Sequence, residues 1–191
     1  MDTWIALVRG INVGGRKKLA MADLRDLLTG MGFSDVQSLL QSGNLFFRCA
    51  THSAADLEQL LTEKAAKDLK IDTDFLVRSG KQWTKIVAKN PYPEDAERDP
   101  SQVAVMCLKQ KPSRASVAHL EKAILGREKI CAIGAELNIV YPDGIGTSKL
   151  THGLIEKTLG TRGTARNWNT VLKIAQCASE ANPRKADAAK S

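Results

Sequence analysis

The sequence has little of what marks several large protein classes. Only 5% of its 191 residues are aromatic, and no apolar run approaches the roughly 20 residues that cross a membrane. The opening Met1-Asp2-Thr3 leads into a short apolar run ended by Arg9, without the basic and long apolar segments of a secretory signal. We therefore expect a cytoplasmic protein that folds unaided.

Metal-binding and catalytic patterns are also lacking. The cysteines and histidines show neither a C-x-x-C pair nor zinc-ligand spacing; they are Cys49, Cys107, Cys131, Cys177, His52, His119 and His152. Buried thiols, no metal site and no cofactor are expected. Because no G-x-S-x-G elbow or Ser/His/Asp set is found, catalytic residues stay unknown and the sequence leaves open whether the protein is an enzyme.

What the chain does have is basic charge, with 28 Lys and Arg against 21 Asp and Glu for a net charge of +7. The surplus favours an anionic partner such as nucleic acid or a phosphorylated small molecule, although a solvated basic surface would show it too. Residues 182–191 are poor in apolar side chains and predict a disordered tail.

The first half predicts the order strand, helix, strand, strand, helix, strand. Leu24, Leu27, Leu28 and Met31 have helical spacing, and a second helix follows Ser53, which resembles a capping partner of Asp56. The predicted strands are 3–9, 36–41, 44–49 and 73–78, with Ser42-Gly43 as a tight turn between the middle two.

The second half nearly repeats this order after a linking helix at 81–89 and a loop up to 101. The predicted strands are 102–109, 129–133 and 136–141, and the predicted helices contain Val117, Leu120 and Ile124, then 148–159. A third helix, with Trp168, Val171, Leu172 and Ala175 on one stripe, takes the place of a last strand.

These patterns predict an α+β fold with two ferredoxin-like (βαββα) subdomains, each an antiparallel sheet with helices on one face. The predicted divisions are an N-terminal βαββαβ subdomain at 1–79, a linking helix and loop at 80–101, a C-terminal βαββαα subdomain at 102–181 and the tail at 182–191.

Four segments resemble, in the same order, the bacterial family called domain of unknown function 1697: ALVRGINVGG, LLQSGN, YPDGIGTSKL and TARNWNTVLKI. The resemblance runs from residue 3 to about residue 176. It implies an α+β fold with duplicated ferredoxin-like subdomains, and it brings no accepted reaction, cofactor or catalytic residue. Leu40 stands where an isoleucine is more usual.

The loop after the first strand is a candidate phosphate site because it places Arg9, Asn12, Gly14-Gly15 and Lys17 before a helix. It is neither a Walker A loop nor a dinucleotide fingerprint, since the required Lys-Ser/Thr pair and G-x-G are missing. Alternatively, the glycines simply permit positive φ and the cations point into solvent.

Two turns supply further candidates. Gln41 and Asn44 flank the hairpin tip, where turn geometry alone favours polar residues and glycine. Lys149 follows the turn at 142–146, and Thr147 or Ser148 is the expected N-cap of the next helix. Capping is the favoured interpretation here, and anion binding at the helix start is the alternative.

The most crowded polar stretch holds Arg162, Arg166, Asn167 and Asn169 around Thr164, the expected N-cap of the last helix. Arginine forks and amides bind phosphates and unstacked bases. The arginines could equally clamp the two halves together, and helical spacing favours Trp168 as a core residue.

Combined, these residues predict a basic cleft between the subdomains that holds a phosphate-bearing ligand, with nucleic acid as the leading class. Arg9, Asn12, Lys17, Lys149, Arg162 and Arg166 would neutralise phosphate, while Gln41, Asn44, Asn167 and Asn169 would orient sugar or base. The alternatives are an enzyme acting on a phosphorylated metabolite or nucleotide, and a structural or protein-interaction module.

Overall fold

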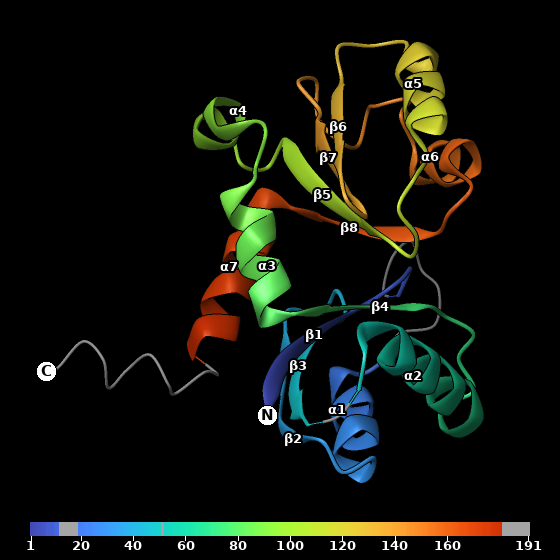
Figure 1. Cartoon of the computed structure of the whole chain (residues 1–191), viewed down its shortest axis with the longest axis vertical. Helices are drawn as coiled ribbons and strands as arrows, with labels where there is room; N and C mark the ends of the chain where they lie inside the picture. Colours follow the sequence, from blue (N-terminus) through green and yellow to red (C-terminus); the bar gives the residue numbers. More distant parts are fainter. Residues whose placement is uncertain (12–18, 51, 181–191) are drawn as a thin grey trace, which may run out of the picture. The chain divides into compact units, whose positions relative to one another are not determined.

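The computed structural model describes residues 1–11, 19–50 and 52–180. These residues form eight strands and seven helices, and the strands make two four-stranded sheets (Figure 1). Contacts divide the chain into two compact units, Met1–Lys85 with Lys173–Ser191 (unit 1) and Ile86–Leu172 (unit 2). The α+β class with two antiparallel sheets is therefore confirmed.

Unit 1 alternates strands and helices in the predicted order. Its elements are β1 Asp2–Val8, α1 Met21–Gly30, β2 Ser34–Leu39, β3 Asn44–Cys49, α2 Ala54–Asp68 and β4 Phe75–Ser79. The strand order across the sheet is β2-β3-β1-β4, with every neighbouring pair antiparallel. The predicted capping box of α2 is confirmed, because Ser53 Oγ accepts from Asp56 N while the Asp56 carboxylate accepts from Ser53 N.

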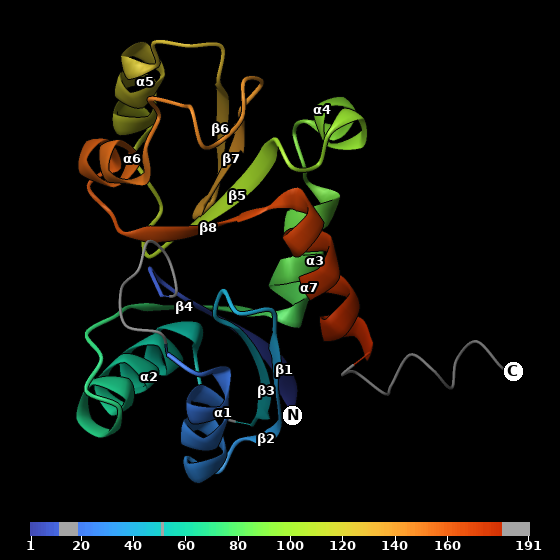
Figure 2. The same ribbon diagram turned by 180° about the vertical axis from the view of Figure 1, so that it is seen from behind.

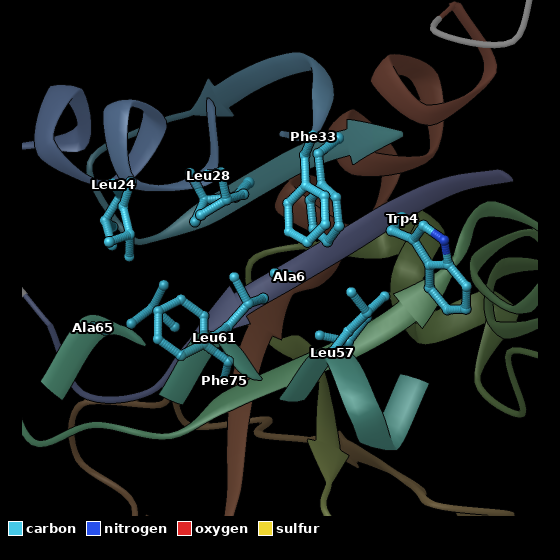
Figure 3. Packing of buried hydrophobic residues seen from close by; sticks show 14 of the residues in the cluster. Trp4, Ala6, Leu24, Leu28, Phe33, Leu57, Leu61, Ala65 and Phe75 are labelled. Atoms are coloured by element: carbon cyan, nitrogen blue, oxygen red, sulfur yellow. The ribbon is translucent and has the colours of Figure 1, made fainter. Parts of the chain in front are cut away.

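The core of unit 1 lies between one face of this sheet and the helices α1 and α2 (Figures 1 and 2). Alternate strand residues such as Ala6 and Phe75 meet Leu24 and Leu28 of α1 and Leu61 of α2 (Figure 3). The period of two in the strands and the three-to-four spacing in the helices bring these apolar faces together.

Unit 2 repeats the arrangement around a second sheet. Its elements are α4 Pro93–Arg98, β5 Val103–Leu108, α5 Arg114–Ala123, β6 Lys129–Ile133, β7 Glu136–Val140, α6 His152–Leu159 and β8 Gly163–Asn167. The strand order is β6-β7-β5-β8, again antiparallel throughout. The helices α3 Gly80–Ala88 and α7 Trp168–Glu180 each contain a boundary between the units.

The structure corrects the predicted end of the second half. Residues 163–167 form strand β8, which pairs with β5, so this half runs βαββαβ and α7 begins only at Trp168. Thr164 is therefore a strand residue, and the cap of α7 is Asn167, whose Oδ1 accepts from Thr170 N at 3.0 Å. Pairing with a central strand has overridden a local sequence that favours a helix start.

Smaller corrections concern turns and helix starts. Four residues, 40–43, connect β2 to β3 instead of two. The expected loop after residue 89 contains α4, which has proline in its first turn. Helix α6 begins at His152 with Thr151 as N-cap, not near Lys149.

Individual burial predictions had mixed outcomes. Trp168 is buried as predicted, whereas Leu172 is 44% exposed. Cys49 and Cys107 are buried, but Cys131 and Cys177 are only half-buried, so the expectation of buried thiols is wrong for these two.

Candidate anion site at the carboxyl ends of the central strands

The two units have the same hydrogen bonds where their central strands end. In unit 1, Val8 N donates to Gly43 O at 2.8 Å and Arg9 N donates to Asp74 O at 2.9 Å. These bonds fix three segments at one end of the sheet: the end of β1, the β2–β3 turn and the residues before β4. Arg9 and Gln41 therefore belong to the same end of unit 1.

Unit 2 has a hydrogen bond equivalent to each of these two bonds. Leu108 N donates to Ala135 O at 2.8 Å and Lys109 N donates to Arg162 O at 2.9 Å. Lys109 thus takes the position of Arg9. Arg162 takes that of Asp74, a residue that is only 6% exposed in unit 1.

Because Arg162 stands in unit 2 where unit 1 has Asp74, the two ends differ in local charge. Arg9 adjoins a carboxylate-bearing residue, whereas Lys109 adjoins a second cation. Lys111 and Arg114 follow Lys109 in the chain, and both are exposed. We call Lys109, Lys111, Arg114 and Arg162 the basic end of unit 2. Two acidic residues accompany it: Glu136 pairs with Cys107 in the sheet, and Glu156 Oε1 accepts from Gly163 N.

Three cations of the basic end were not among the predicted residues. Their signal was present in the sequence, because Lys109 follows the second central strand as Arg9 follows the first. Lys111 and Arg114 then lead into α5, whose N-cap Ser113 accepts from Ser116 N. Aligning the two halves strand by strand would have found all three.

Asn44 has a structural role in the hairpin turn. Its side chain is fully buried, and Nδ2 donates to Leu39 O at 2.9 Å and to Ser42 Oγ at 3.1 Å. The amide thereby links the last carbonyl of β2 to the Ser42 side chain and holds the turn in shape. The family-like segment LLQSGN is therefore explained by turn geometry.

Replacing Asn44 with aspartate is expected to lower the free energy of unfolding by about 2 kcal/mol. A carboxylate cannot donate to the Leu39 carbonyl, and a buried charge without a donor is costly. Urea denaturation would measure the change. Gln41→Glu is the matched control because Gln41 is exposed in the same turn, and a surface change there should alter stability by less than about 0.5 kcal/mol. Equal losses in both variants would contradict this role for Asn44.

The candidates of unit 2 do not gather at one place. Arg162 precedes β8, whereas Asn167 pairs with Ala104 at the other end of that strand, about 16 Å away at strand spacing. Lys149 also lies away from Arg162, near the start of β5: Tyr141 N donates to Gln102 O, and Tyr141 Oη donates to Leu150 O. Within unit 2, Arg162 alone of the predicted residues belongs to the basic end.

Arg166 and Asn167 are held by their own unit. Arg166 is 8% exposed in the middle of β8, and its Nη1 donates to Thr164 Oγ1 at 2.9 Å and to Ala165 O at 2.8 Å. Burial lowers the pKa of Arg166 to about 10. Asn167 caps α7, and Asn169 is exposed in the first turn of that helix. Asn12 and Lys17 lie outside the described residues.

The motif YPDGIGTSKL forms a loop that is held in place by hydrogen bonds within the loop and to Arg127 and Glu128. Arg127 donates to both carboxylate oxygens of Asp143, Thr147 Oγ1 donates to Asp143 O at 2.7 Å, and Ser148 Oγ donates to Glu128 Oε1. Arg127 holds the pKa of the exposed Asp143 carboxyl below its usual value. These contacts support a structural role for the motif.

The described residues offer neither a metal cluster nor a membrane-spanning helix. No group of three or more His, Cys, Asp or Glu among them could hold a metal ion. None of the helices they form is both long enough and apolar enough to cross a membrane.

Comparisons with known proteins bear on the family and the fold. A family model described as "Protein of unknown function (DUF1697)" matches residues 1–137. A search of curated proteins found no match. Among solved structures, the conserved bacterial protein SP0830 from Streptococcus pneumoniae is similar, with a TM-score of 0.72 and 25% identity over 93% of this chain and 98% of that one.

Proposed function

The chain belongs to the family Protein of unknown function (DUF1697), and we propose that it binds a phosphate-bearing ligand, nucleic acid being the leading class, at the basic end of unit 2. The observation that carries this proposal is the exchange of Asp74 in unit 1 for Arg162 in unit 2 at positions with the same backbone hydrogen bond. A cation beside a carboxylate in unit 1 therefore corresponds to two neighbouring cations in unit 2.

The chemistry of the basic end suits phosphate. Arg162 offers a planar fork that can donate two hydrogen bonds to one phosphate, and the lysines act as mobile point charges. The start of α5 adds the partial positive charge of a helix N-terminus beside Arg114. Four cations against Glu136 and Glu156 leave a local surplus of positive charge, in keeping with the net charge of +7.

Unit 1 offers a smaller candidate of its own. Arg9 is half-buried and Gln41 is exposed at the corresponding end of unit 1, where they would provide a second anion contact. Asn44, Arg166 and Asn167 already serve their own turns and strands, so the proposal assigns them no ligand contact. A cytoplasmic location, where nucleic acid and phosphorylated metabolites are abundant, is part of the proposal.

Replacing Lys109 and Arg162 together with alanine should weaken binding to a fluorescein-labelled 20-nucleotide single strand. If each cation neutralises one phosphate, the slope of log K against log salt should become shallower by about 1 to 2. Fluorescence anisotropy titrations between low and moderate salt would measure the slope. Both residues are exposed and outside the core, so the double variant is expected to fold.

The matched control removes the same charge elsewhere. Lys81 and Lys85 are exposed on α3 in unit 1, and their double alanine variant should keep the slope of the unmodified protein. Absence of low-salt binding to every DNA and RNA strand tested would refute nucleic acid as the ligand. Equal effects in both double variants would refute the basic end as the site.

We further propose that both units are ferredoxin-like. The element order β-α-β-β-α-β in each unit supports this assignment, as do the strand orders β2-β3-β1-β4 and β6-β7-β5-β8.

A further inference from the structure

A groove runs between helix α5 and strand β6 of unit 2. It encloses about 470 Å³, a volume typical of ligand clefts. Val117 and Ala118 of α5 form one wall, and Ile130 and Ala132 of β6 form the other. The groove therefore has one wall made by a helix and the other by a strand, and both walls present apolar side chains.

The strand wall is an edge. The sheet order places β6 at the end of the sheet, paired with β7 on one side only. An edge strand presents backbone N–H and C=O groups that an added extended chain can pair with. Alternate side chains of such a chain would point into the space beside α5, as in peptides bound by strand addition.

The two ends of the groove carry opposite charge. Lys111 and Arg114 line it at the start of α5, while Glu121 lines it two turns later. Among the described residues, no ion pair is seen for Lys111 or Arg114. Two cations beside a helix N-terminus attract a carboxylate, and apolar walls favour apolar side chains behind it.

We propose that this groove binds an extended peptide, which pairs with β6 as an additional strand and places a carboxylate between Lys111 and Arg114. The carboxylate is either the peptide's C-terminus or an acidic side chain. This inference shares Lys111 and Arg114 with the proposed phosphate site, but it is carried by the groove and the strand edge, which the nucleic acid proposal does not use.

The test uses random heptapeptides with free C-termini, displayed on phage and selected on the full-length protein. Selected peptides are synthesised with a fluorophore at the N-terminus, and their affinity is measured by anisotropy. The double variant Lys111→Ala, Arg114→Ala should weaken binding about tenfold or more, equivalent to loss of about 1.4 kcal/mol. Lys122→Ala, which removes a charge from α5 without lining the groove, is the matched control and should leave affinity unchanged.

A second variant separates peptide binding from general electrostatics. Ala118 is exposed, and Ala118→Trp fills the groove without changing charge. It should abolish peptide binding and leave oligonucleotide binding intact, so failure of this proposal and failure of the nucleic acid proposal are distinguishable. Peptide affinity that survives Ala118→Trp would overturn the proposal.

Two further measurements address the carboxylate and the strand pairing. Amidating the peptide C-terminus, or changing its acidic side chain to the amide, identifies which carboxylate binds; an affinity that changes with neither modification overturns the proposal. Hydrogen exchange at the amides of residues 130–133 should slow in the complex. Unchanged exchange there would rule out pairing with β6.

Discussion

Replacing Gly163 with alanine is expected to lower the free energy of unfolding by about 3 kcal/mol, the upper part of the range for overpacked sites. A Cβ atom at this position would lie 2.7 Å from the Cys107 backbone oxygen, 2.8 Å from Leu108 Cδ2 and 2.9 Å from Met106 Cε. The first of these contacts decides the outcome, because the carbonyl belongs to the central strand β5 and cannot move without disturbing its pairing with β8. Urea denaturation followed by circular dichroism would measure the loss.

Gly153 provides the matched control in the same unit. It lies in α6, where a Cβ atom would meet nothing within 4 Å, and alanine favours a helix over glycine by up to about 1 kcal/mol. Gly153→Ala should therefore leave stability unchanged or raise it. A Gly163→Ala protein as stable as the unmodified protein would show that β8 does not approach β5 so closely.

Gly163 also explains why the last strand was hard to predict. The residues of β8, Gly163 to Asn167, include no Val, Ile or aromatic side chain, and Thr164 is a good N-cap ahead of a helical stripe. What makes the segment a strand is its pairing with β5, where glycine permits close approach. The near-repeat of the first half was the available signal, since β4 occupies the same place after α2.

Elements whose burial follows a simple period were predicted well. The apolar stripe of α1 and the capping box of α2 fixed those helices to within a few residues, because periodicity and caps act locally. Helix α6 was placed too early because two potential caps, Ser148 and Thr151, lie three residues apart. Ser148 instead donates to Glu128 and accepts from Leu150 N, so only Thr151 caps the helix.

For the candidate residues, polarity in the sequence does not distinguish ligand binding from a role in capping or turns. Asn44 and Asn167 both looked suited to a ligand, yet each hydrogen-bonds a backbone group in the neighbouring element. Arg166 is buried in a strand centre, a position that charge alone would not suggest. The equivalence of Lys109 and Arg9, which an alignment of the two halves would have suggested, is given directly by their matching hydrogen bonds.

Replacing Phe75 with alanine should cost about 4 kcal/mol of unfolding free energy, as expected for removal of a fully buried aromatic ring. Phe75 begins β4, is 0% exposed, and lies beside Leu61 and Ala65 of α2 in the core of unit 1 (Figure 3). Phe75→Leu keeps most of the apolar volume and should cost about 1 kcal/mol. Urea denaturation would compare the two variants, and equal losses would contradict a close-packed ring at this position. The comparison separates the contribution of side-chain volume to the packing of β4 on α2 from that of apolar character alone. Because Asp74 directly precedes β4, this packing also keeps Asp74 beside Arg9 at the end of unit 1.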